Sequence, residues 1–228
     1  MRIGLLGGSF NPIHRCHLII AAETRDHLHL NQVLFIPSGD PPHKPSTGLA
    51  PAHHRCEMVR LAIDAEPSFG LSDLELHRAE KSYTIETVRA LRLQLGSAAE
   101  LVFILGLDAF LDFPSWRHPA ELLELCHFVV VSRPASQFTS LEGFPFLPAA
   151  DPEALRSLDA RRQDRLDLPL PGGTAVTLLH VHPCDVSASE IRRRISVGES
   201  VSGLLPAPVE SYIIRYGLFR EDTNHTRL

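Results

Sequence analysis

The chain has 228 residues, of which 44% are hydrophobic and 21% charged, as is typical of a soluble globular protein. A net charge of −5 argues against duplex DNA or RNA as the main partner, although a local basic pocket for a small phosphate ligand is compatible with it. There is no apolar run of about 18 residues, so no membrane span is expected.

The four cysteines, Cys16, Cys56, Cys126 and Cys184, are far apart in the sequence and form no C-x-x-C pair. The apolar run at the amino terminus is too short for a signal peptide. We therefore expect a cytoplasmic protein with reduced thiols, and the spacing argues against a structural zinc site.

Short apolar runs alternate with helical patterns along the chain. Strands separated by helices predict an α/β fold with a parallel sheet. In chain order, the pattern predicts a strand at 3–6, a helix at 14–28, a strand at 33–36, helices at 53–65 and 84–95, a strand at 101–105, a helix at 120–125, strands at 128–132 and 176–181, and helices at 187–197 and 209–216.

We expect residues 1–220 to form one domain. Residues 134–173 are its least regular part, and we interpret them as a surface excursion with one helix from Pro152 to about Arg165. The polar tail at 221–228 is expected to be disordered.

The run GGSFNPIHRCH, from Gly7 to His17, follows the first strand and opens the first helix. An open parallel sheet binds nucleotides at this kind of position, outside the carboxyl ends of its strands. Gly7 and Gly8 let the backbone approach a phosphate closely. His14 and His17 lie on one face near the helix amino terminus, where the helix dipole favours anions. The run is neither a Walker A nor a G-x-G-x-x-G motif, which argues against a P-loop kinase or a dehydrogenase.

A second anion site is predicted at the helix that begins after Ser187. Ser187 and Glu190 form a capping-box pattern, while Ser189 and Arg192 add a hydroxyl and a cation near the helix start. The alternative is an ordinary capped helix with exposed arginines.

Together these segments resemble motifs of the adenylyl- and cytidylyltransferase superfamily. The run 7–17 resembles G-G-[ST]-F-[ND]-P-x-H-x-G-H, and 186–192 resembles I-S-S-T-x-I-R. Four further matches point to bacterial nicotinate-nucleotide adenylyltransferases: PPHK at 41–44, SYTIET at 82–87, G-x-D at 106–108 followed by Trp116, and the strand end VSRP at 131–134. The resemblance covers the chain from Arg2 to about Arg220 and is weakest at 134–173.

The resemblance implies a Rossmann-like, doubly wound parallel sheet with helices on both faces, as a single nucleotidyltransferase domain. It implies transfer of the adenylyl group of ATP to nicotinic acid mononucleotide, which gives nicotinic acid adenine dinucleotide and pyrophosphate in NAD biosynthesis. The acceptor phosphate would attack the α-phosphorus in line, and Mg²⁺ would arrive with ATP. The expected partners are these small molecules, with neither nucleic acid nor membrane; the oligomeric state is left open, a homo-oligomer included.

The resemblance also implies roles for residues. His17 would contact the α-phosphate, His14 would orient the phosphates, and Arg192 would hold the leaving pyrophosphate. The implied ATP-binding residues are Gly7, Gly8, Ser9, Phe10, His14, Cys16, His17, Gly106, Asp108, Ser187, Ser189 and Arg192. The implied nicotinate nucleotide-binding residues are Lys44, Tyr83, Thr84, Trp116, Arg117 and Arg133.

Cys16 departs from the family pattern, which has glycine before the second histidine. That glycine lets the adenine lie against the helix, so a cysteine side chain is expected to crowd or shift the base. Three alternatives stay open: a phosphopantetheine adenylyltransferase or cytidylyltransferase, an inactive nucleotide-binding module, and an enzyme that prefers the nicotinamide nucleotide. Arg117 or His118 could bias the acceptor pocket toward the acid.

Overall fold

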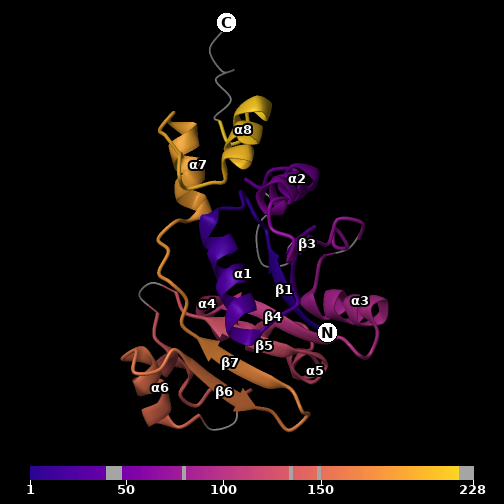
Figure 1. Ribbon diagram of the computed structural model, residues 1–228, viewed down its shortest axis with the longest axis vertical. Helices are drawn as coiled ribbons and strands as arrows, with labels where there is room; N and C mark the ends of the chain where they lie inside the picture. The colour runs from indigo at the N-terminus through magenta and orange to yellow at the C-terminus, as the bar shows by residue number, and fades with distance from the viewer. Residues whose placement is uncertain (40–47, 79–80, 134–135, 148–149, 221–228) are drawn as a thin grey trace, which may run out of the picture.

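The computed structural model describes residues 1–39, 48–78, 81–133, 136–147 and 150–220 (Figure 1). Its sheet has seven strands in the order β3-β2-β1-β4-β5-β7-β6. All neighbouring strands are parallel except β6 and β7. The strands are β1 (Arg2–Gly8), β2 (Gln32–Pro37), β3 (Phe69–Leu71), β4 (Glu100–Gly106), β5 (His127–Val131), β6 (Arg165–Pro169) and β7 (Ala175–Leu179).

The direction in which strands are added reverses next to β1. The chain builds β2 and β3 on one side of β1 and then returns to place β4 on its other side. Such a switch point leaves a crevice beyond the carboxyl ends of the two central strands, which is where open α/β sheets bind ligands. Here those ends are Gly8 and Gly106.

Helices cover both faces of the sheet. The α-helices are α1 (Arg15–Leu28), α2 (Ala52–Ile63), α3 (Thr84–Leu95), α4 (Leu107–Leu111), α5 (Pro119–Leu125), α6 (Pro152–Asp159), α7 (Ala188–Ser196) and α8 (Ala207–Tyr216). In Figure 1, α7 and α8 lie at one end of the molecule, whereas α6 and β6 lie at the other.

Successive side chains along the buried strands point alternately into two separate hydrophobic cores. On β4, Leu101 and Phe103 belong to a core with residues of α3, α4 and α5. Val102 and Ile104 point the other way, into a core with residues of α1, α2, α7 and α8. Since successive side chains of a strand face opposite sides, a continuous apolar run is what a strand covered on both faces requires. The predicted α/β class with helices on both faces is confirmed.

The ends of two predicted helices agree closely with their local chemistry. The helix α3 occupies the predicted residues and ends at Gly96, whose φ of 79° suits glycine. At α7, the Ser187 hydroxyl accepts a 3.2 Å hydrogen bond from the Glu190 N–H, as the cap pattern predicted.

Within 134–173, the helix expected from Pro152 is present, but its expected end near Arg165 was wrong. The helix α6 ends at Asp159, and Arg165 begins β6, an antiparallel edge strand paired with β7. A 3₁₀ turn, η2 (Phe138–Leu141), packs with α6 against the core. The buried side chains of η2, α6 and β6 are spread thinly along the sequence, so no strong periodicity marked them: Phe138, Leu141, Leu155, Leu158 and Leu168. The short strand β3 was missed as well. The tail at 221–228 lies outside the described residues.

Within the described ranges, none of the helices combines the length and apolar character that crossing a bilayer requires.

Candidate active site

The glycines at the switch point make room for the backbone and for charged groups. A methyl group added to Gly8 would lie 3.3 Å from the Phe10 ring. At Gly106 it would overlap the Asp108 carboxylate and lie 2.7 Å from Arg133 Nε. Arg133 Nε and Asp108 Oδ1 are themselves 3.5 Å apart. Gly106 therefore leaves room for an ion pair beyond the ends of β4 and β5, which a larger residue would displace.

The two predicted histidines meet at the start of α1. Their ring centroids are 3.8 Å apart, and the His14 N–H donates a 3.2 Å hydrogen bond to His17 Nδ1. Because Nδ1 of His17 is an acceptor, the proton of its neutral ring lies on Nε2. His17 thus presents an Nε2–H donor, in the first turn of a helix whose dipole favours anions.

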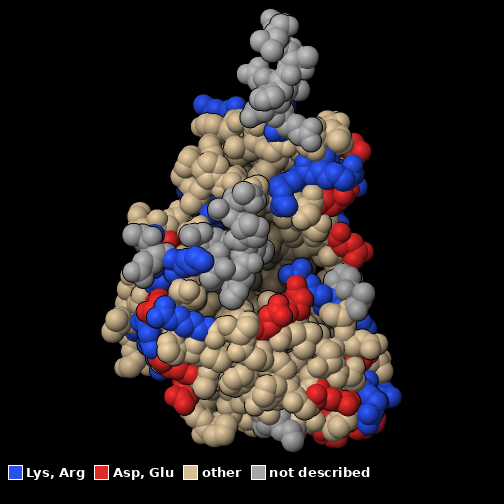
Figure 2. Space-filling model, turned by 180° about the vertical axis from the view of Figure 1, so that it is seen from behind, with Lys and Arg blue, Asp and Glu red and all other residues tan. Residues whose placement is uncertain are grey.

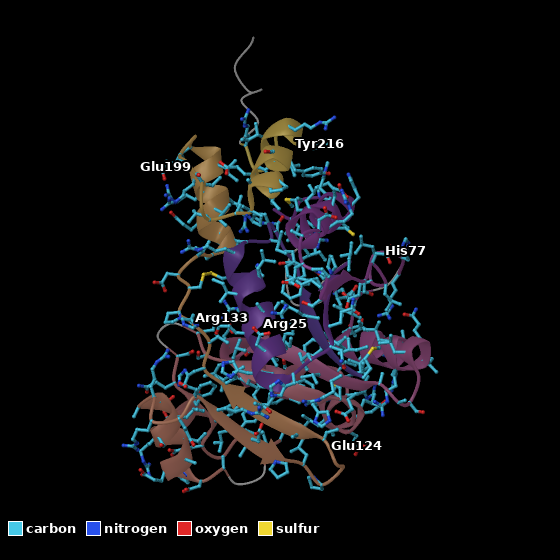
Figure 3. All side chains as sticks on the ribbon, in the orientation of Figure 1. Arg25, His77, Glu124, Arg133, Glu199 and Tyr216 are labelled. Atoms are coloured by element: carbon cyan, nitrogen blue, oxygen red, sulfur yellow. A yellow bond between two sulfur atoms is a disulfide. The ribbon has the colours of Figure 1, made fainter. Side chains whose placement is uncertain are left out.

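His14 is held neutral by its surroundings. It is buried, and burial, followed by the positive charge of Arg133, lowers its pKa from 6.5 to about 4. Its buried Nδ1 has no hydrogen-bond partner in the described part of the chain. A buried imidazole beside an arginine is therefore available as a neutral hydrogen-bonding group near neutral pH. Figure 3 labels Arg133 beside α1.

The loop between β1 and α1 is held by two residues that the sequence reasoning did not select for the site. Arg55, 2% exposed, donates hydrogen bonds to the carbonyls of Ser9 at 2.8 Å, Ala50 at 2.9 Å and Gly39 at 3.1 Å. Asn11 Nδ2 donates to the Gly48 carbonyl, and Asn11 Oδ1 accepts from the Ala50 N–H, both at 2.9 Å. The only available signal for Arg55 was an arginine on the apolar side of a predicted helix.

The second predicted anion site lies against the first. Arg192 Nη1 donates a 2.7 Å hydrogen bond to the Asn11 carbonyl, and Nη2 donates to Ser189 Oγ at 3.2 Å. These bonds use two of the five N–H groups of a guanidinium. The next two arginines behave differently, because Arg193 and Arg194 pair with the carboxylate of Glu190. The sequence predicted the convergence only through the resemblance, since about 170 residues separate the motifs.

Four of the six predicted acceptor residues form a second group around the start of α3. Thr84 is its first residue, so its N–H has no acceptor within the helix. The Arg117 guanidinium lies 4.9 Å from the centroid of the Tyr83 ring. Trp116 is half-buried, with its ring 6.0 Å from that of Phe103. Phe103 in turn lies 3.6 Å from the space that a methyl group on Gly7 would fill, which connects this group to the glycine loop.

Of the other two predicted acceptor residues, Arg133 follows β5 and pairs with Asp108, whereas Lys44 lies outside the described residues, as does the whole of PPHK at 41–44. Of the predicted ATP-binding residues, Ser9 contributes its carbonyl to Arg55, and Phe10 packs edge-on against His17 with ring centroids 5.1 Å apart. His118 begins α5 with an exposed side chain, next to Arg117.

A cavity of about 310 Å³ opens beside α1. Cys16 and Ile20 of α1 form one wall, Ser132 and Arg133 follow β5, and the segment from His180 to Cys184 closes it. The cavity therefore touches the first motif at Cys16 and the segment that leads to the second motif at Cys184. On the face seen in Figure 2, positive and negative side chains are mixed, with no large patch of a single sign.

The expectation that all thiols are reduced was wrong for two cysteines. Cys16 and Cys184, separated by 168 positions, form a disulfide, and their Cα atoms are 5.6 Å apart. The packing of the segment after β7 against α1 brings them together, which the sequence spacing could not show. The bond is drawn in yellow in Figure 3, between α1 and the segment that leads to α7. Cys56 and Cys126 are free.

Known proteins resemble this chain over nearly its whole length. The model of the Cytidylyltransferase-like family matches residues 5–194. A relative from Pelobacter propionicus named "Probable nicotinate-nucleotide adenylyltransferase" is 44% identical, over 97% of this chain and 99% of its own. A relative of the same name from Geobacter metallireducens is 43% identical, over 97% of this chain and 100% of its own.

The chain belongs to the nicotinate-nucleotide adenylyltransferase family. The fold agrees: the nicotinic acid mononucleotide adenylyltransferase of Plasmodium falciparum, solved with NaAD, superposes with a TM-score of 0.69 at 20% identity. That alignment covers 96% of this chain and 97% of the other. The rival assignment to phosphopantetheine adenylyltransferases is not supported by these relatives.

Proposed function

We infer that this member of the family transfers the adenylyl group of ATP to nicotinic acid mononucleotide, giving nicotinic acid adenine dinucleotide and pyrophosphate. One observation carries the inference at the level of the site. Arg192 of the second motif bonds to the carbonyl of Asn11, in the loop that leads from β1 to the histidine pair of the first motif, although the two motifs are far apart in the chain. Histidine and arginine N–H groups at a switch point can donate hydrogen bonds to the phosphates of a nucleoside triphosphate.

The reaction is a direct displacement. An oxygen of the acceptor's 5′-phosphate forms a bond to the α-phosphorus of ATP, while the bond from that phosphorus to the β-phosphate bridging oxygen breaks and pyrophosphate leaves. The attacking phosphate is ionised at neutral pH, so the step requires no general base. Catalysis then depends on positioning and on stabilising charge at the transferring group.

In this proposal His17 donates from Nε2–H to a non-bridging oxygen of the α-phosphate, where charge builds up in the transition state. The His14 N–H holds the His17 ring in that tautomer. Arg192 directs its remaining N–H groups at the leaving pyrophosphate, while its bonds to Asn11 and Ser189 fix its orientation. The adenosine occupies the cavity that Cys16 and Arg133 line.

The acceptor binds on the other side of Gly7. We propose that the pyridine ring stacks on Trp116 and that the N–H of Thr84, at the start of α3, meets the nicotinate carboxylate. Arg117, fixed over the Tyr83 ring, adds a positive charge on the same side and favours the acid over the amide. Lys44 would meet the acceptor phosphate.

Nucleotidyltransferases of this family generally use a divalent metal ion with ATP. We propose that the ion is Mg²⁺ and that it enters on the triphosphate as part of the substrate, where it offsets charge on the phosphates. The same proposal assigns the reaction to the cytoplasm, with small molecules as the only partners.

The test is pyrophosphate release from ATP and Mg²⁺ with three acceptors in parallel: nicotinic acid mononucleotide, its amide, and phosphopantetheine. We expect turnover with the acid well above that with the amide and none with phosphopantetheine. A preference for the amide would overturn the acceptor assignment alone. ATP binding without turnover on any acceptor would instead indicate an inactive nucleotide-binding module.

A further inference from the structure

The disulfide joins the first motif of the site to the segment that directly precedes the second motif. Cys16 lies between His14 and His17 in the first turn of α1. Cys184 lies three residues before Ser187, the amino-terminal cap of α7, which carries Arg192. One covalent bond therefore connects the helix start that carries the histidines to the approach of the helix that carries the arginine.

Both cysteines also line the cavity beside α1. Cys16 is 5% exposed, whereas Cys184 is partly exposed and stands between two exposed neighbours, Pro183 and Asp185. A thiol reagent in solvent can therefore approach the Cys184 sulfur, while the Cys16 sulfur lies behind it.

We propose that Cys16 and Cys184 form a reversible thiol–disulfide site whose reductant is a dithiol, and that its state sets the affinity for ATP. This rests on the proposed function in two respects, namely that the adenosine occupies the cavity and that the protein is cytosolic. Disulfides of cytosolic proteins, where present, are usually transient and redox-sensing.

Reduction of the disulfide proceeds by two thiol–disulfide exchange steps. A thiolate of the dithiol attacks the Cys184 sulfur and forms a mixed disulfide, and the bond to Cys16 breaks. Cys16 leaves as a thiolate in the first turn of α1, where the helix amino terminus favours negative charge, and then takes up a proton. The second thiol of the reductant displaces Cys184, which is protonated in turn. The protein gains two electrons and two protons, and the reductant becomes a cyclic disulfide.

In the reduced state, the Cys16 thiol and the segment around Cys184 would still contact neighbouring groups of the protein. The Cys16 sulfur lies 3.4 Å from the Val186 carbonyl, so the thiol, once formed, has a hydrogen-bond acceptor in place. The segment also keeps a non-covalent link to α1, because the His182 N–H donates to Glu23 at 2.8 Å. Reduction is therefore expected to loosen the segment without unfolding it.

We expect reduction to weaken ATP binding, because the disulfide preorganises the site. The disulfide fixes one wall of the cavity and the approach to Ser187 before ATP arrives. When the bond is broken, the two sulfurs separate to a non-bonded distance, and ATP binding must order the segment again. We expect the dissociation constant for ATP to rise about tenfold on reduction, since ordering a loop on binding weakens affinity.

The experiment measures ATP binding with Mg²⁺ by calorimetry and needs no acceptor. One sample is oxidised with a cyclic disulfide and another is reduced with dithiothreitol. Thiol titration and peptide mapping identify the bond, with two free thiols expected in the oxidised chain, Cys56 and Cys126. Cys184→Ser should bind ATP with the weaker constant in both samples, whereas the matched control Cys56→Ser should respond to reduction as the unmodified chain does.

The proposal is overturned if no Cys16–Cys184 peptide is found after oxidation, if ATP affinity is the same in both states, or if Cys184→Ser still responds to reduction. Its failure is distinguishable from that of the proposed function. Redox-dependent ATP binding without turnover on any acceptor would remove the function and keep this site. Turnover on nicotinic acid mononucleotide with redox-independent ATP binding would do the opposite.

Discussion

Arg192 Nη1 donates a 2.7 Å hydrogen bond to the main-chain carbonyl of Asn11, across 181 positions of sequence. Asn11 is itself fixed by bonds of its side chain to Gly48 and Ala50. The arginine is thus aimed by the loop that also carries the histidines, and the two motifs form one unit.

This relationship predicts that Arg192→Ala lowers turnover by on the order of 10²–10³, as the loss of one charge-stabilising donor typically does. Steady-state pyrophosphate release gives the value. The matched control is Arg193→Ala on the next residue, whose guanidinium pairs with Glu190 and Glu199 and does not reach the loop. Equal losses in the two variants would show that Arg192 acts only through the general charge of α7.

His17→Ala should fold normally and lose turnover by a similar factor of about 10²–10³, because it removes the Nε2–H donor from the α-phosphate. Circular dichroism checks the fold and the pyrophosphate assay the rate. The control is His77→Ala, since His77 is largely exposed and pairs with Asp73, away from the histidine pair of the first motif. An active His17→Ala enzyme would contradict the catalytic assignment.

Trp116→Ala should raise the KM for nicotinic acid mononucleotide about tenfold and leave the KM for ATP nearly unchanged, because stacking on a base or pyridine ring contributes roughly 1–3 kcal/mol. Trp116→Phe should recover part of the loss. The two constants come from titrating each substrate at saturation of the other. If both rise equally, Trp116 serves the packing around Phe103 and Phe113 and not the acceptor.

Elements whose structure depends on neighbouring residues could be predicted from the sequence, whereas elements that depend on distant contacts could not. The limits of α3 and the Ser187 cap depend on neighbours within one turn, and both were predicted. By contrast, β6 is a strand because its residues pair with β7. The buried side chains of η2 and α6 pack against residues of elements that are distant in the sequence.

The site divides in the same way. The glycines, histidines and arginine belonged to recognisable motifs, so they could be named in advance. Arg55 and the Cys16–Cys184 bond were missed because their meaning depends on tertiary contacts: three carbonyls from separate segments in one case, and a cysteine 168 positions away in the other.

Arg55→Met should destabilise the chain by about 3 kcal/mol or more, since it keeps most of the side-chain volume but leaves three carbonyls without their buried donor. Urea unfolding at pH 7 measures the change. The matched control is Arg60→Met on the same helix, which breaks an exposed pair with Glu57 and should cost far less stability. Similar values for the two variants would mean that water replaces the Arg55 bonds.

The histidine pair also predicts how stability depends on pH. His14 has a pKa of about 4 when folded and of 6.5 in its ordinary state. Between these values the unfolded chain binds a proton that the folded chain does not, so stability falls as the pH drops through this window and is unaffected by His14 above it.

From pH 7 to pH 5 the contribution amounts to about 2 kcal/mol. His14→Gln, which cannot be protonated, should therefore lose about 2 kcal/mol less than the unmodified chain between urea unfolding at pH 7 and at pH 5. If His14→Gln shows the same pH dependence as the unmodified chain, His14 is protonated in the folded protein at pH 5. A neutral imidazole beside Arg133 could then no longer be part of the mechanism at that pH.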